Sequence, residues 1–131
     1  MSYLFDSSAI FKAVAGNVIE VLTGNYTVEL ARYELGNILW KERIHHRRLS
    51  GGEAEELIKL IKDALSLMKV LSVDCHEEEV FNVAEKLELT FYDASYVYYA
   101  EKMSLTLITE DEKLTDKAKP RIKVSKLNSI L

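Results

Sequence analysis

The chain has 131 residues, a length that suits one domain with a sizeable buried core. Hydrophobic residues make up 48% and charged residues 29%, and no apolar run is long enough to predict a membrane span. The net charge of −4 argues against a protein that binds nucleic acid through overall positive charge. Cys75 is the only cysteine, which excludes an intramolecular disulfide and a multi-cysteine zinc site.

Short apolar runs alternate with segments of helical periodicity along the whole chain. Strands are predicted over residues 2–6, 70–73, 106–109 and 122–124, with a further brief extended segment at about residue 27. Helices are predicted over residues 9–15, after residue 27 as far as 49, over 51–68 and 77–87, and from 90 to about 100, with a short amphipathic piece over 17–24. This order predicts a three-layer α/β domain over residues 1–131, in which helices flank a central parallel sheet of about five strands.

The predicted helix ends have recognisable caps. Ser7 or Ser8 is the expected N-cap of the first helix, and Ser50 and Glu53 have the spacing of a capping box. The helix that follows Ser50 repeats apolar residues at intervals of three and four, which predicts one buried face. That face consists of Ala54, Leu57, Ile58, Ile61, Ala64, Leu65 and Met68.

Two carboxylates in the first half of the chain are candidate functional groups. Asp6 directly follows the first strand, where its structural alternative is a helix cap. Glu34 falls within the core-facing stripe of a helix, where burial of a carboxylate costs several kcal/mol unless it is paired or bound to a metal. Its alternative is an acid at the edge of the stripe that reaches water or pairs with Lys41.

Two further carboxylates lie in the second half. Asp93 stands three residues after Thr90, so it either completes a capping box or begins a core-facing row. Asp111 follows the strand over 106–109 in an acidic turn, where it either complements a helix dipole or belongs to a site. Glu110 can take the place of Asp111 if that strand ends one residue earlier.

In a parallel sheet these four acids are placed to converge on one rim, beyond the carboxyl ends of the strands. Four unpaired carboxylates repel one another strongly in a low dielectric, and a divalent cation removes that conflict. Ligands that are all oxygen favour Mg²⁺ or Mn²⁺ over zinc. A metal held in this way supports in-line displacement at phosphorus by an activated water.

Four segments resemble the motifs of PIN-domain ribonucleases, above all the VapC-type toxins of toxin–antitoxin pairs. They read, in chain order, LFDSSAI, ARYEL, YDASYVYYA and TEDEKL. The resemblance implies that Asp6, Glu34, Asp93 and Asp111 form the acidic metal site, with Ser8 and Thr109 supporting it through hydroxyl groups. It also implies a central parallel sheet, a Mg²⁺- or Mn²⁺-dependent endoribonuclease activity, an RNA substrate, a VapB-like antitoxin and a homodimer.

Basic and aromatic side chains supply candidate contacts. Lys41, Arg43, Arg47 and Arg48 are candidate phosphate contacts on the helix that carries Glu34, or else a solvated face. A second basic zone has the same two interpretations; it comprises Lys117, Lys119, Arg121, Lys123 and Lys126. In the predicted helix after Thr90, four tyrosines either support a protein contact or divide between core (Tyr96, Tyr99) and surface (Tyr92, Tyr98).

The leading hypothesis is therefore a cytoplasmic metal-dependent endoribonuclease that acts as a toxin. The alternatives are an inactive PIN-like module that binds RNA or protein, and a nuclease that works in RNA processing or on DNA. Cys75 beside His76 is either half of a Cys/His metal pair or a buried or half-buried thiol near a strand end.

Overall fold

A computed structural model describes residues 2–131 and contains one five-stranded sheet. The strands are β1 (Tyr3–Phe5), β2 (Tyr26–Val28), β3 (Lys69–Leu71), β4 (Thr106–Ile108) and β5 (Val124–Ser125). They lie in the order β3-β2-β1-β4-β5, and every neighbouring pair is parallel. The predicted central parallel sheet is confirmed.

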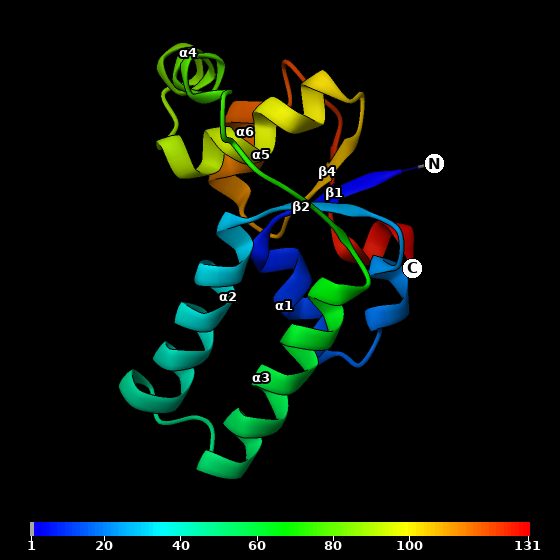
Figure 1. Cartoon of the computed structure of the whole chain (residues 1–131), viewed down its shortest axis with the longest axis vertical. Helices are drawn as coiled ribbons and strands as arrows, with labels where there is room; N and C mark the ends of the chain where they lie inside the picture. The colour runs from blue at the N-terminus through cyan, green and yellow to red at the C-terminus, as the bar shows by residue number, and fades with distance from the viewer. Residues whose placement is uncertain (1) are drawn as a thin grey trace.

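Helices cover both faces of the sheet (Figure 1). On one face, α1 packs against both α2 and α3; on the other, α4 packs against α5, and α6 contacts β5. Their bounds are α1 (Ser7–Ala15), α2 (Leu30–Trp40), α3 (Gly51–Ser66), α4 (Glu77–Leu87), α5 (Phe91–Lys102) and α6 (Glu112–Ala118). Shorter helical turns are η1 (Ile19–Leu22), η2 (Lys41–His45) and η3 (Leu127–Ile130). Within residues 2–131, no helix combines the length and apolar character that a bilayer crossing requires.

The strand order places a topological switch point between β1 and β4. From β1 the chain builds β2 and β3 on one side, and it then returns to add β4 and β5 on the other. Phe5 and Ile108 end the two central strands, pair in register and are fully buried. The residues that follow them therefore meet at the crevice where parallel α/β sheets form their sites.

The capping box of α3 is confirmed, but the predicted cap of α1 is wrong. Ser50 accepts a hydrogen bond from the backbone N–H of Glu53, and the Glu53 carboxylate accepts one from the N–H of Ser50. Helix α1 begins at Ser7 and is capped by Asp6, whose Oδ1 accepts the N–H of Ala9 at 3.0 Å. The extended backbone of Asp6 brings its carboxylate over the first turn, so neither serine is the cap.

The predicted long helix through residue 49 is also wrong, because α2 ends at Trp40. A turn of π-helix, η2, follows it, and Arg47 then has a left-handed φ of 53°. These two features reverse the chain so that α3 can begin at Gly51.

The buried face predicted for this helix is confirmed at Ile61, Ala64, Leu65 and Met68, whereas Ala54 and Leu57 are half-buried and Ile58 is exposed. Ile61 is 3% exposed, whereas Ile58 is 42% exposed although it was predicted on the same face. The apolar face of α3 is wider than the part of the helix that α1 and α2 cover. Ile58 lies at the edge of that face and is left exposed to solvent.

We predict that Ile61→Ala lowers the free energy of unfolding by about 2–5 kcal/mol, because it opens a cavity in the core. Ile58→Ala, the matched change one turn earlier, should lower it by less than about 1 kcal/mol. Urea unfolding of both variants measures the difference. Equal losses would contradict the packing described for α3.

Candidate active site

Asp6 lies at the crevice between β1 and β4, held by groups from both sides. Its Oδ1 accepts hydrogen bonds from Ser8 Oγ (2.7 Å) and from the N–H of Ala9, and its Oδ2 accepts one from Thr109 Oγ1. The two hydroxyls in turn accept backbone N–H groups of the β4–α6 connection: Ser8 that of Glu110 and Thr109 that of Asp111. Ser8 and Thr109 thus fix the orientation of Asp6 and link the ends of the two central strands.

Burial dominates the charge state of Asp6, which is 5% exposed. It raises the pKa of the carboxyl group from 3.8 to about 6, even though the hydrogen bonds from Thr109, Ser8 and Ala9 act to lower it. The negative charge of Glu34 adds to the rise.

Glu34 lies in the second turn of α2, half-buried at the edge of the core. Its Oε1 accepts a hydrogen bond of 2.6 Å from the hydroxyl of Tyr96, a fully buried residue of α5. Burial and the Glu34 charge raise the pKa of the Tyr96 hydroxyl, so that it stays protonated and remains a donor. The tyrosine holds one oxygen of Glu34 and leaves the other available.

Asp93 stands in the first turn of α5, and Thr90 caps that helix through the backbone N–H of Asp93. Burial raises the pKa of the Asp93 carboxyl group, and the charges of Asp111 and Glu34 raise it further, while Lys117 acts to lower it. The capping role therefore belongs to Thr90 and to the backbone of Asp93, and no hydrogen bond from residues 2–131 engages the Asp93 carboxylate.

Asp111 caps α6, because its Oδ1 accepts the N–H groups of Lys113 and Leu114. Glu110 is committed elsewhere: it pairs with Lys12 at 2.9 Å and accepts the N–H of Leu127. Partial burial acts to raise the pKa of Glu110, but these two partners hold it below the usual value. The geometry therefore separates the roles of the two adjacent acids.

The four predicted carboxylates lie within electrostatic reach of one another, from Asp6 to Glu34, Glu34 to Asp93 and Asp93 to Asp111. Three of them sit at helix N-termini, where the helix dipole favours negative charge. As the side chains stand, no three His, Cys, Asp or Glu groups among residues 2–131 close around a point that would hold a metal. The donor set still fits a hard divalent cation, because it is all oxygen, because the negative charges of neighbouring acids raise the pKa values of Asp6 and Asp93, and because no hydrogen bond from residues 2–131 engages the Asp93 carboxylate.

The predicted RNA contacts lie at the turn between α2 and α3, at the far end of this helix pair from the sheet (Figure 1). Lys41, Arg43 and Arg47 are exposed, and Arg48 pairs with Glu42 at 3.2 Å. Lys41 is about 10 Å along the helix axis from Glu34.

The sequence did not predict two neighbours of the acids. Tyr96 donates a hydrogen bond to Glu34, and the positive charge of Lys117 acts to lower the pKa of Asp93. Tyr96 follows Asp93 by one helical turn, and that spacing was the available signal.

Two other side-chain predictions are wrong. Tyr98 is buried with Tyr96 and Tyr99, which leaves only Tyr92 of that group exposed, because α4 covers this side of α5. Cys75 is exposed, since it occupies a turn with a left-handed φ of 68° rather than the end of a strand.

The family model described as PIN domain matches residues 1–120. The chain belongs to the PIN-domain family. Among curated relatives it is 39% identical over 129 residues to Exonuclease VapC9 of Pyrobaculum aerophilum, covering 97% of this chain and 93% of the relative. It is 37% identical over 94 residues to Ribonuclease VapC3 of the same organism, covering 70% of each chain.

Solved structures show the same PIN fold. A crystal structure from Pyrobaculum aerophilum superposes with a TM-score of 0.78 at 35% identity, covering 99% of this chain and 93% of the other. VapBC2 from Rickettsia felis, solved with a DNA fragment from its promoter, superposes with a TM-score of 0.64 at 16% identity, covering 96% and 98% of the two chains. The second likeness supports the fold alone.

The raised pKa of Asp6 predicts that the ionised Asp6 carboxylate lowers the free energy of unfolding of this PIN-domain protein. A carboxyl group with a pKa of about 6 when folded, and about 4 when unfolded, destabilises the fold progressively as the pH rises between these values. In EDTA at pH 7.5, Asp6→Asn should therefore raise the free energy of unfolding by up to about 3 kcal/mol, since asparagine keeps the capping oxygen. At pH 4 the gain should nearly vanish.

Urea unfolding at the two pH values measures this effect, with Asp116→Asn on the exposed side of α6 as the control. A gain from Asp6→Asn that is larger at pH 4 than at pH 7.5 would contradict the assigned charge state.

Proposed function

We propose that this PIN-domain protein is a divalent-metal-dependent endoribonuclease and the toxin component of a toxin–antitoxin pair. The observation that carries the proposal is the linked set of Asp6, Glu34, Asp93 and Asp111 at the carboxyl edge of the sheet, where burial and mutual repulsion raise the pKa values of Asp6 and Asp93. The names of the curated relatives support a nuclease. We further propose that residues 1–131 form a single nuclease domain, because both helical layers pack on one sheet.

Asp6, Asp93 and Asp111 are the proposed metal ligands, with Glu34 as a direct or water-mediated fourth. When bound, Mg²⁺ or Mn²⁺ would supply an activated water and offset the negative charge of the phosphate. Ser8 and Thr109 keep Asp6 in one orientation, as supporting hydrogen bonds do at metal sites. Tyr96 holds Glu34 by one oxygen, and the other remains free to orient water near the phosphate.

RNA is the proposed substrate. Lys117 lies on the Asp93 side of the site, and Lys41, Arg43, Arg47 and Arg48 lie at the end of the α2–η2 segment. Contacts to phosphates from these cations would position a strand without reading its sequence. The relatives are named an exonuclease and a ribonuclease, so internal cleavage needs its own test.

A VapB-like antitoxin is the proposed protein partner, because both curated relatives carry VapC names. An apolar hollow of about 190 Å³ lies beside the acids, between the carboxyl ends of β2 and β3 and the start of α5. Phe91 and Tyr92 line it, and Tyr92 is 61% exposed. This hollow suits an apolar side chain of such a partner. We also propose a homodimer as the working assembly.

The decisive test is cleavage of a circular single-stranded RNA, which has no ends for an exonuclease. Protein expressed without an antitoxin should cut it in Mg²⁺ or Mn²⁺ but not in EDTA. Asp93→Asn and Asp6→Asn should each lower the rate by about 100-fold or more, because each removes a ligand charge. Asp116→Asn, which removes an equal charge on exposed α6, should leave the rate unchanged.

The substrates and variants separate the alternatives. Cutting of linear but not circular RNA would replace the endonuclease with an exonuclease. Cleavage of a matched DNA circle at the same rate would contradict RNA as the substrate. Equal rates of cleavage by Asp93→Asn and the wild type would contradict the assignment of the four acids as the active site.

A further inference from the structure

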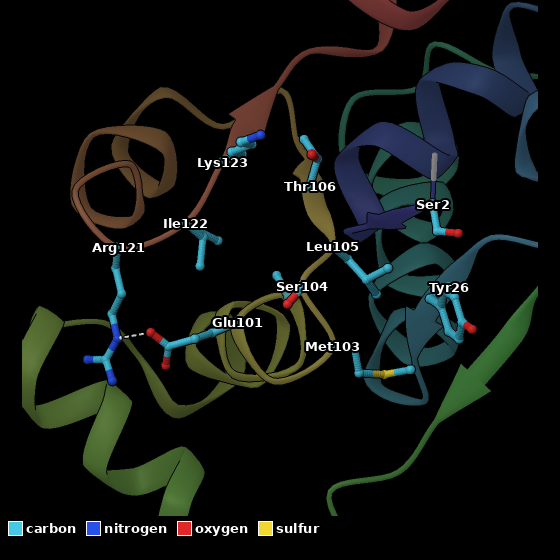
Figure 2. A pocket seen from close by; sticks show the side chains of 11 residues that line it. Ser2, Tyr26, Glu101, Met103, Ser104, Leu105, Thr106, Arg121, Ile122 and Lys123 are labelled. Atoms are coloured by element: carbon cyan, nitrogen blue, oxygen red, sulfur yellow. Dashed lines mark hydrogen bonds and ion pairs between the residues drawn. The ribbon is translucent and has the colours of Figure 1, made fainter.

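A second cleft of about 640 Å³ opens at the amino ends of the strands, at the opposite edge of the sheet from the four acids. Ser2, Tyr26 and Thr106 line it at the starts of β1, β2 and β4. The α5–β4 turn and the segment before β5 complete it (Figure 2). Its volume lies within the range of sites that bind small molecules.

One side of the cleft is cationic. Arg121 and Lys123 contribute two positive charges, and Glu101 is the only acid among the lining residues. The guanidinium Nε of Arg121 donates to Glu101 at 2.7 Å, and the terminal nitrogens of Arg121 point away from Lys123 (Figure 2). Lys123 is therefore the cation that is placed to meet an anion in the cleft. Lys123 is exposed. Excess positive charge in a concave site on a chain of net charge −4 favours an anionic group.

The other side is apolar and aromatic. Figure 2 shows Met103, Leu105 and Tyr26 across Ser104 from the cations. Lys69 lies over the Tyr26 ring at 5.2 Å from its centroid and adds positive charge behind this wall. A ligand that fills the cleft therefore needs an anionic end and a flat or apolar end.

Ser104 divides these two sides with a strained backbone. Its φ is 53°, and it follows Met103, the C-cap of α5, at the position where glycine is the usual residue. Serine at this position keeps a hydroxyl group in the cleft, and Ser2 and Thr106 supply two more. The Ser104 and Thr106 hydroxyl groups lie between the cations and the apolar wall, where they match the sugar of a nucleotide (Figure 2).

We propose that this cleft binds a nucleoside phosphate, with the phosphate on Lys123 and the base against Met103 and Tyr26. The ligand is either a free mononucleotide or the terminal nucleotide of an RNA strand. The site is separate from the acids in space, and binding there does not depend on cleavage.

The test uses the full chain labelled with ¹³C at the methionine methyl groups, in EDTA so that a metal cannot bring nucleotides to the acids. The chain has three methionines: Met103 lines the cleft, and Met68 is buried as an internal control. Titration with AMP should shift the Met103 signal and leave that of Met68 unchanged. Adenosine should bind at least about tenfold more weakly, because it lacks the charged group.

Two charge reversals test the phosphate contact. Lys123→Glu should weaken AMP binding by about tenfold or more, whereas Lys59→Glu on the exposed side of α3 should not. A 5′-phosphorylated trinucleotide in place of AMP distinguishes the two sources, since tighter binding would identify an RNA end and equal or weaker binding a free nucleotide. An unmoved Met103 signal at millimolar AMP, equal binding of adenosine, or an unchanged affinity in Lys123→Glu would each overturn the proposal.

Discussion

The burial of Asp6 between the two central strands is the constraint on which the site depends. The Asp6 carboxylate caps α1 and accepts hydrogen bonds from the hydroxyl groups of Ser8 in α1 and Thr109 at the end of β4. The negative charge of Glu34 also acts on it. Its pKa of about 6 shows that these hydrogen bonds do not fully offset the cost of burial. A fold that keeps such a group concentrates negative charge where a cation would be held most strongly.

Much of this arrangement could be predicted from the sequence, because local signals and topology agree. Helix α4 and the Thr90 cap of α5 follow from periodicity and side-chain type, and the parallel sheet follows from alternation of strands and helices. The convergence of the acids follows from the rule that sites lie beyond strand carboxyl ends. The cap of α1 could not be chosen, since aspartate and serine are both good caps and backbone conformation decides between them. The end of α2 depends on a chain reversal that periodicity does not record.

The two edges of the sheet differ in charge. Carboxylates gather at the carboxyl edge, whereas Arg121 and Lys123 are among the residues that line the cleft at the amino edge. The second basic zone is largely paired, since Lys119, Arg121 and Lys126 each contact an acid and Lys117 donates to the backbone of Glu88. The net charge of −4 therefore does not describe the local electrostatic potential, which is negative at one edge of the sheet and positive at the other. For nucleic-acid binding, the distribution of charge matters more than the net charge.

The central claim is that the four acids act together as one divalent-cation site. Thermal unfolding in Mn²⁺, compared with KCl of equal ionic strength, tests it most directly. The wild type should be stabilised by several degrees in Mn²⁺, because a cation that binds only the folded state shifts the unfolding equilibrium. Asp93→Asn should lose that stabilisation, while Asp116→Asn should keep it. An equal rise in Tm for the wild type and Asp93→Asn would contradict the account.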